Sequence, residues 1–431
     1  MSRTRIVCLV AILISLAAAI TCYFLANHFP EHIYRSEKLM DSYFGSDLPR
    51  TYANMTDRHS SFWATYKHPL YGLVFLPAGY LLRVVFGLST QATAQLFLGV
   101  NMFVWTLTLF ACLFFLTKRI LDTCLYVALA LSTSSVLFWF TVPESFCFGS
   151  TTILLPILLA MIPRFSRNYI LHVAAQVVSA SITLTNWMAG FLSSLFKQGV
   201  RRTVQIALHA LAVLTILWSV QLKMAPSATF FMNSPTLAWE AKWWVRDCMS
   251  VSIPMKLKYL FFDPVASSPM IYHVVPAEKY EVQWGKWPPN DLPRLDVDET
   301  AARQPQQSQA VAGLFSIPLH GCYMVLWSFV LAFGIFCLVR QSFKSPALRV
   351  IAACLFGQAV LHMLYDVRET FIYSAHWVPL LVLTVATTSK TRFRPYVLGA
   401  VALIIVYCGI TNVSLYAACL RLLETFSAWA Q

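Results

Sequence analysis

The chain has 431 residues, of which 58% are hydrophobic and only 12% are charged. Soluble domains carry about 25% charged residues, so this composition excludes an ordinary soluble protein and predicts an integral membrane protein. The formal net charge of +13 does not indicate a nucleic-acid partner, because the lysines and arginines of membrane proteins gather in short cytoplasmic loops.

The cysteines give no sign of a metal site or a disulfide framework. All eleven are scattered singly, and most lie in apolar runs, where cysteine behaves as a small hydrophobic residue. The chain has no CxxC motif and no Cys/His spacing typical of zinc. We therefore expect no cofactor, and nothing in the sequence indicates a divalent metal.

Long apolar runs predict many membrane-spanning helices, because one span needs about 20 mainly apolar residues. The first run follows Arg3 and Arg5 as in a signal peptide, but its length and the lack of a clear cleavage site predict an uncleaved helix. About eleven spans are expected, at 6–26, 92–116, 121–140, 147–162, 169–185, 187–197, 203–222, 313–338, 347–364, 371–388 and 395–416.

One further apolar run, 70–88, decides the topology. It contains Pro77 and a central Arg83, and a central arginine costs about 2.5–3.5 kcal/mol on insertion scales. We therefore expect a juxtamembrane or re-entrant helix on the outer face. The N-terminus is then inside, and the later basic clusters all fall inside as well, at Lys118/Arg119, Arg164/Arg167, Lys197/Arg201/Arg202, Arg340/Lys344 and Lys390/Arg392/Arg394.

This topology divides the chain into three parts. Residues 1–222 form an N-terminal transmembrane module whose first outer loop is 28–91, and 312–431 form the C-terminal helices. Between them, 223–311 is an extracytoplasmic segment rich in tryptophan and proline. Its first half is expected to form interfacial amphipathic helices, and its second half an irregular loop. The expected fold class is all-α.

The stretch 43–71 is crowded with polar residues. A carboxylate close to the membrane surface can act as a general base that takes a proton from an acceptor hydroxyl. Asp47 is the favoured candidate, because Arg50 would hold it ionised. Asp41 and Asp57 are its rivals, and the structural alternative for Asp47 is a solvated loop residue or a helix cap.

Lys67 and His68 precede Pro69, at the start of the expected juxtamembrane helix. Proline in a first helical turn has a local explanation. The two basic residues lie at headgroup depth, where they are expected either to hold a lipid phosphate or to act only as interfacial anchors.

Glu144 follows Pro143 at an outer helix end. It is either a second functional carboxylate or an acidic residue that the helix dipole favours at an N-terminus. Asn186 and Trp187 mark another outer corner, for which the anchoring role common to tryptophan is the preferred reading.

The stretch 365–377 is the second candidate site. Glu369, Tyr373 and His376 follow one another at helical spacing and so share one face. A histidine near the top of an apolar span is costly unless it faces a cavity or a partner. Arg368, beside Asp366, is suited to pairing with a phosphate. The alternative is a structural network that ties helix tops together.

These motifs resemble the GT-C superfamily of membrane glycosyltransferases, which includes protein O-mannosyltransferases and lipid A aminoarabinose transferases. In that family an acidic residue in the first outer loop precedes an HPP- or KP-like motif by about twenty residues. Asp47 and Lys67-His68-Pro69 fit this pattern, with Leu70 in place of a second proline. The Pro143-Glu144 corner and the run 369–376 resemble further family motifs. The resemblance covers about 1–222 in layout and 347–388 by motif.

The resemblance implies a polyprenyl-phosphate-linked sugar donor and inversion at the anomeric carbon, with Asp47 as general base. The first loop has no DxD pair, which suits the metal-independent members. The acceptor is a glycan, a lipid or a protein, and the site faces outward from a bacterial cytoplasmic membrane. The expected catalytic residues are Asp47, Glu144 and Glu369; the expected substrate-binding residues are Arg50, Asp57, Lys67, His68, Asp366, Arg368, Tyr373 and His376.

Two other functions fit the composition. A transporter or flippase for a lipid-linked or small polar substrate usually has ionisable residues near the midplane and paired broken helices, which this sequence lacks. A membrane scaffold without activity would not need acidic residues clustered at outer helix ends.

Overall fold

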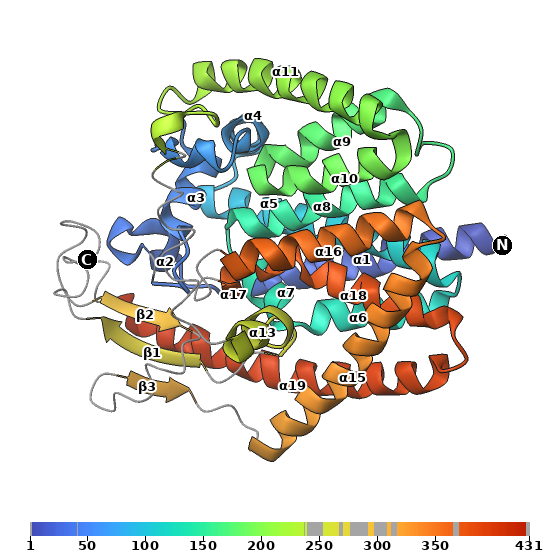
Figure 1. The fold of residues 1–431 in the computed structure, drawn as a ribbon. Helices are drawn as coiled ribbons and strands as arrows, with labels where there is room; N and C mark the ends of the chain where they lie inside the picture. The colour runs from blue at the N-terminus through green and yellow to red at the C-terminus, as the bar shows by residue number, and fades with distance from the viewer. Residues whose placement is uncertain are drawn as a thin grey trace.

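The computed structural model describes residues 2–40, 42–236, 238, 253–266, 270–275, 292–296, 308–311, 317–364 and 370–427. Within these ranges the protein is a bundle of helices with one small sheet (Figure 1). Most of the longer helices run across the view of Figure 1, side by side.

Six of the described helices are long and apolar enough to cross a membrane. Their outward sides expose large apolar side chains. Leu13, in the first of these helices, is 55% exposed, and Phe329, in the helix that begins at residue 317, is 72% exposed. Such faces fit an integral membrane protein. The six are α1 (Arg3–Asn27), α5 (Thr90–Thr117), α11 (Val200–Met224), α15 (Ile317–Ser342), α16 (Pro346–Leu364) and α19 (Arg394–Thr425).

The expected number of about eleven spans is not confirmed, because the remaining apolar runs form shorter helices. The run 121–140 is divided at Thr133, whose hydroxyl accepts from the Val136 N–H and begins a new helix. The shorter elements are α6 (Ile120–Ser132), α7 (Ser134–Trp139), α8 (Ser145–Met161), α9 (Tyr169–Ile182), η3 (Leu184–Asn186), α10 (Trp187–Gln198), α17 (Thr370–Tyr373), η6 (Ser374–His376), α18 (Val378–Ala386) and η7 (Thr387–Lys390).

The core is centred on α5, which packs against α1, α6 and α8. Its Trp105 is fully buried, packs against Phe140 with ring centroids 4.9 Å apart, and donates from Nε1 to Ser150 Oγ at 2.8 Å. A buried indole N–H needs such a partner. This contact fixes α8, which begins directly after Glu144, against the first helices.

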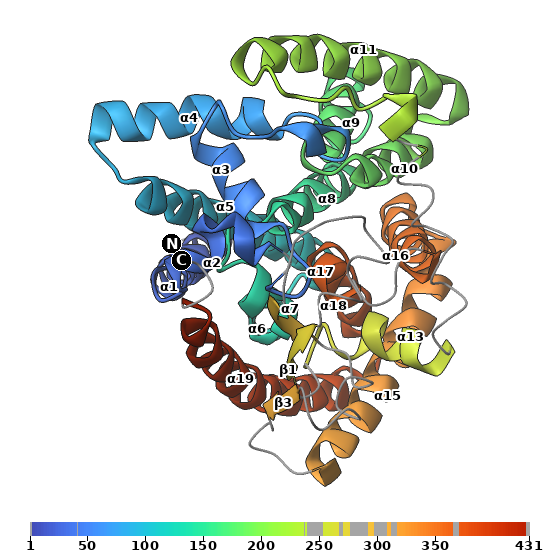
Figure 2. The same ribbon diagram turned by 90° about the vertical axis from the view of Figure 1, so that its left-hand side faces the viewer.

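The first loop forms several short elements at the end of the bundle where α1 ends (Figure 1). In Figure 1 α4 is viewed along its axis while α1 lies across the view, and Figure 2 shows α4 from the side. Thus α4 runs transverse to α1, as expected for a juxtamembrane helix. The elements are α2 (Glu31–Arg35), η1 (Glu37–Leu39), α3 (Leu48–Thr56), η2 (Trp63–Tyr66) and α4 (Tyr71–Phe86).

The arginine in the last turn of α4 has a local partner. Arg83 Nη1 donates to the backbone oxygen of Thr56, the last residue of α3, at 2.9 Å. Gly79 lets the two helices approach, since a Cβ there would lie 2.8 Å from the Met55 oxygen. Arg83, whose charge would be costly in lipid, therefore donates a hydrogen bond to the C-terminal end of α3.

In the described residues of the middle segment the structure has a helix and three strands, α13 (Ile253–Phe261), β1 (Met270–Val275), β2 (Leu292–Asp296) and β3 (Ser308–Val311). The strands form an antiparallel sheet in the order β2-β1-β3. The sequence analysis predicted irregular loop there, and for the strands that prediction was wrong: the run MIYHVV has the β-branched and aromatic residues that strands favour. The interfacial helices expected before it lie mostly outside the described residues, apart from α13.

Residues 260–266, which we call the α13 turn, enter the bundle and bond to α7, α15, α19 and Trp377. Three carbonyls accept from buried aromatic side chains: Leu260 O from Trp377 Nε1 (2.7 Å), Phe261 O from Trp327 Nε1 (2.6 Å) and Phe262 O from Tyr323 Oη (3.1 Å). Irregular backbone inside a membrane protein requires such partners. Further bonds come from Ser134 to Asp263 O (2.5 Å) and from Asn412 to Val265 O (2.8 Å).

Candidate functional site

Asp47 lies directly before α3 and forms an ion pair with Arg50 one turn later. It accepts no side-chain capping bond at the helix start, so the reading of Asp47 as an ordinary cap is not supported. The Asp47 side chain is 38% exposed and that of Arg50 only 12%. The arrangement is a carboxylate that is open to solvent on one side and paired with a guanidinium on the other.

A left-handed turn precedes Asp47 and brings Phe44 against the late segment of the chain. Phe44 and Gly45 have φ angles of +51° and +71°, and a positive φ is uncommon for a residue with a bulky side chain. The ring of Phe44 is held by Phe371, at a centroid distance of 5.2 Å, and by Trp139 at 6.0 Å. The first loop is therefore fastened to α17 through this aromatic cluster.

His68 is fixed in a buried turn. Its Nδ1 lies 2.6 Å from the Ile182 backbone oxygen, and a carbonyl only accepts, so Nδ1 holds the proton and Nε2 is the lone-pair nitrogen. The pKa of His68 is lowered to about 3, chiefly by burial and also by the charges of Lys67 and Arg50, although the bond to Ile182 acts in the opposite direction. At neutral pH the ring is uncharged, so a phosphate contact from His68 would be a hydrogen bond and not an ion pair.

The position of Lys67 is fixed by a hydrogen bond to its backbone oxygen. The Leu184 N–H donates to the Lys67 oxygen at 2.8 Å, and the Leu70 N–H donates to Ser181 O at the same distance. These bonds join the start of α4 to the end of α9. Lys67 Nζ lies 5.6 Å from the centroid of the Tyr66 ring, so the lysine is half-buried near the same turn as His68.

Glu144 precedes α8 and is buried, with 1% exposure. Its Oε1 accepts from the Ser145 N–H at 2.6 Å and from Ser145 Oγ at 3.0 Å. The structural role that the sequence suggested, an acid at a helix N-terminus, is thus present. Burial raises the pKa of Tyr71, and nearby Glu144 raises it further, so this carboxylate also lies close to the start of α4.

The ring of Phe146 joins three of the expected site residues. Its centroid lies 4.8 Å from that of Tyr373, 5.6 Å from that of His376 and 6.4 Å from that of His68. Residues from the first loop, from α8 and from the late segment therefore meet around one aromatic side chain. His376 is 1% exposed.

Other expected residues stand apart or are not described. Asp57 is exposed, and its Oδ1 accepts from the His59 N–H at 2.9 Å in a local turn. The predictions for Asp41, Asp366, Arg368 and Glu369 fall outside the described residues.

Asn186 and His376 belong to a buried group of amides and imidazoles whose other members, Gln358 and His362, were missed by the sequence analysis. His362 Nε2 lies 3.1 Å from Gln358 Oε1, and Gln358 Nε2 donates to Asn186 Oδ1 at 3.3 Å. Asn186 Nδ2 in turn lies 3.5 Å from His376 Nε2. The available signal was the pair Gln358 and His362, one turn apart in an apolar run, because polar residues inside spans are rare.

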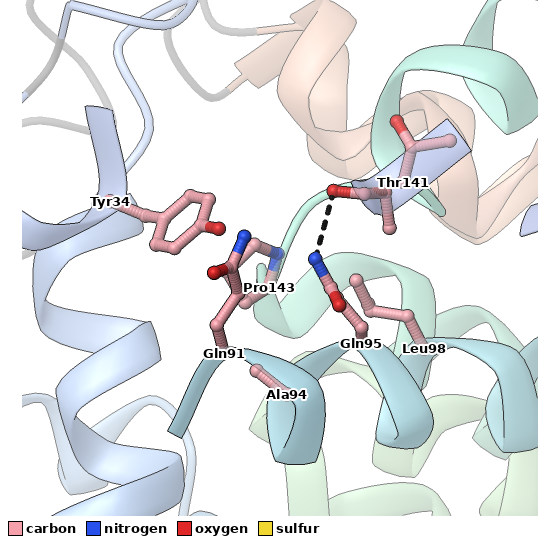
Figure 3. A pocket seen from close by; sticks show the side chains of 8 residues that line it. Tyr34, Gln91, Ala94, Gln95, Leu98, Thr141 and Pro143 are labelled. Atoms are coloured by element: carbon pink, nitrogen blue, oxygen red, sulfur yellow. Dashed lines mark hydrogen bonds between the residues drawn. The ribbon is translucent and has the colours of Figure 1, made fainter. Parts of the chain in front are cut away.

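A small cavity lies between the C-terminal end of α1, the start of α5 and the corner before Glu144 (Figure 3). Tyr34, Gln91, Thr141 and Pro143 line it. Gln95 and Ala26 line it as well, and Gln95 Nε2 donates to the Ala26 backbone oxygen at 3.3 Å. Its volume of about 10 Å³ is the space of one water molecule. It is too small for a sugar or an isoprenoid chain.

Within the described part of the chain, no group of three or more His, Cys, Asp or Glu side chains has the arrangement of a metal site. No protein-family model matches this chain, and neither a curated protein nor a solved structure matches it.

Proposed function

We propose that this protein is a membrane glycosyltransferase that moves a sugar from a polyprenyl-phosphate donor to an acceptor hydroxyl outside a bacterial cytoplasmic membrane. The observation that supports it best is the Asp47–Arg50 pair, a partly exposed carboxylate three residues after Phe44, whose ring packs against Phe371. The first-loop residues His68 and Asp47 come from the segment that resembles the GT-C motifs.

The chemistry is a single displacement. The acceptor oxygen attacks the anomeric carbon, the bond from that carbon to the phosphate oxygen breaks, and polyprenyl phosphate leaves. Asp47 takes the hydroxyl proton, which requires an ionised carboxylate within reach of the acceptor. The guanidinium of Arg50 keeps Asp47 ionised, and Arg50 and Lys67 are the cations nearest to His68 for the phosphate.

The geometry of α4 suits a donor that arrives from the lipid. Its C-terminal half exposes Tyr80, Val84 and Phe86 at 70%, 60% and 66%. A helix transverse to α1 with such a face fits the boundary between headgroups and acyl chains. His68 lies three residues before the start of the same helix, so a lipid-bound substrate would come close to the polar residues.

Replacing Asp47 by Asn tests the proposal. The isosteric amide cannot take a proton, and we expect transfer to fall by about 10²–10⁴-fold, the usual contribution of a general base. The assay uses vesicles that contain the purified protein and a panel of labelled polyprenyl-phosphate sugars, with membrane extracts as acceptor. Asp57→Asn is the matched control, because Asp57 lies in the same loop but is exposed.

Full activity in Asp47→Asn, with normal insertion of the protein, would remove Asp47 from this role. Equal losses in Asp47→Asn and Asp57→Asn would indicate a general defect of the loop.

A transporter or flippase is a second candidate, favoured by the buried polar group formed by His362, Gln358 and Asn186. Polar residues inside a bundle often mark a substrate path. Counterflow of a labelled lipid-linked sugar into vesicles, without chemical change of the sugar, would support this function over transfer.

A further inference from the structure

The orientation of the Asn186 side chain is determined by its neighbours. Nδ2 lies 3.1 Å from the Gly149 backbone oxygen, and a carbonyl accepts only. Oδ1 faces Gln358 Nε2 at 3.3 Å. A flipped amide would bring oxygen to oxygen at Gly149 and nitrogen to nitrogen at Gln358, so Nδ2 is the group directed to His376.

His376 must therefore accept on Nε2. The Asn186 Nδ2 donor lies 3.5 Å from that nitrogen, and a proton on Nε2 would face the N–H of the amide. The histidine is 1% exposed beside the Phe146 ring, where an imidazolium would lose its hydration. The remaining state is a neutral ring with its proton on Nδ1.

At His362, the other end of the group, the hydrogen bond is donated in the same direction along the chain of residues. Since Gln358 uses its nitrogen to donate to Asn186, its Oε1 accepts from His362 Nε2 at 3.1 Å. The donors thus point in one direction, from His362 through Gln358 and Asn186 to His376. The rings of Tyr373 and Trp377 hold His362, with centroids at 5.1 Å and 4.5 Å.

Gly149 provides the space in which these atoms meet. A Cβ at this position would lie 2.6 Å from His376 Nε2, and 3.0 Å from both Asn186 Nδ2 and Thr183 Oγ1. Any side chain would push the imidazole away from the amide. The backbone of α8 is therefore part of the arrangement.

We infer that His362, Gln358 and Asn186 form a directed chain of hydrogen bonds that holds His376 as the neutral tautomer with its proton on Nδ1. Resting on the function proposed above, Nδ1 is then the His376 nitrogen that keeps a proton and would donate it to a sugar or phosphate oxygen. Asn186 and Gln358 are positioning residues, because they act through His376.

Nitrogen NMR of the full-length protein in nanodiscs, with ¹⁵N-labelled histidine, tests the tautomer without any substrate. The His376 signals are assigned by their loss in His376→Gln. In the wild type we expect a protonated Nδ1 and an unprotonated Nε2. In Asn186→Asp the carboxylate offers only acceptors, so Nε2 should become protonated.

Asn101→Asp is the matched control, because Asn101 is also a buried asparagine but accepts from Thr151 on another helix pair. It should leave the His376 signals unchanged. Gln358→Met, which keeps the volume but frees the Asn186 amide to turn, should give a mixture of tautomers. A protonated Nε2 in the wild type, or an unchanged pattern in both Asn186→Asp and Gln358→Met, would overturn the inference.

Kinetics separate this inference from the proposed function. In Gln358→Met we expect kcat for transfer to fall by about tenfold with KM nearly constant, which corresponds to the loss of one hydrogen bond that positions a reacting group. A wild-type protein without transferase activity but with the expected tautomer would reject the proposed function alone. An active enzyme with the other tautomer would reject the chain of hydrogen bonds alone.

Discussion

The guanidinium of Arg50 lies over the ring of Trp63, 4.7 Å from its centroid, while it also pairs with Asp47. The cation–π contact joins η2 to α3 and fixes the side chain that holds the proposed base. An arginine used in this way cannot be replaced by lysine without loss, because the planar group both stacks and forms the ion pair.

This contact predicts that Trp63→Leu lowers transfer activity although Trp63 itself performs no chemistry. A cation–π contact at a partly exposed site contributes about 0.5–1 kcal/mol, which corresponds to a loss of about two- to fivefold in kcat/KM. Steady-state kinetics of the variant in vesicles would measure it. Trp218→Leu, on α11 beside Phe230, should leave kcat/KM unchanged, and a loss in the control of the same size would contradict the explanation.

The lowered pKa of His68 predicts how stability depends on pH. The folded protein keeps the ring neutral down to a pKa of about 3, whereas the unfolded chain binds a proton near pH 6.5. Between these values the unfolded state holds one more proton, so stability falls as pH decreases, by up to about 1.4 kcal/mol per pH unit. Above about pH 6.5 this contribution is constant.

His68→Asn should weaken that dependence, since an amide can still donate to Ile182 but does not titrate. Thermal unfolding in detergent, followed at pH 7.5, 6.0 and 4.5, gives the comparison. The melting temperature of the variant should decrease less on acidification than that of the wild type. Parallel curves for the two proteins would mean that His68 is not buried as described.

The α13 turn predicts that two tryptophans stabilise the fold through their N–H groups. In Trp377→Phe and Trp327→Phe a phenyl ring takes up part of the space of the indole, and Leu260 O and Phe261 O lose their donors. Leaving a buried carbonyl without its partner costs about 1–3 kcal/mol, so each variant should unfold at a lower temperature. Tyr396→Phe, at a side chain that is 78% exposed, should unfold like the wild type.

The close packing around Gly149 predicts that adding a side chain there lowers transfer activity. Gly149→Ala should displace His376 or Asn186 and reduce transfer by at least tenfold, because a position shift of this size near reacting groups has large effects. Gly399→Ala in α19, where a Cβ would meet nothing within 4 Å, is the control and should keep full activity. Transfer rates and melting temperatures of both variants would distinguish a local effect from general misfolding.

The sequence predicted those features that depend on neighbouring residues. Apolar length predicted the helices, and Pro77 with Arg83 predicted that α4 differs from a span, because both are costly in lipid. Asp47 and Arg50 are one helical turn apart, so their ion pair follows from spacing alone. The basic residue Arg394 was expected at an inner end, but its bidentate bonds to buried Asp122, at 2.7 Å and 2.5 Å, join residues 272 positions apart.

The features that could not be predicted are hydrogen bonds between residues far apart in the sequence. Gln358 and Asn186 are separated by 172 residues, and no local pattern indicates which amide meets which. The α13 turn is a similar case, since its partners Trp377 and Trp327 were interpreted as parts of apolar runs. Tertiary packing decides these contacts, and periodicity of apolar residues carries no information about them.

The α13 turn has a consequence for how the chain assembles. Its carbonyls bond to side chains of α15 and α19 and to Trp377, which directly precedes α18. Those donors come later in the chain than the turn, so the carbonyls of Leu260, Phe261 and Phe262 receive their partners only as synthesis proceeds, whereas the earlier Ser134 already bonds to Asp263 O. The bond from Asn412 to Val265 O forms last. Completion of this part of the bundle is then a late step of biogenesis, and a protein truncated before residue 412 would lack one of the donors that lock the turn in place.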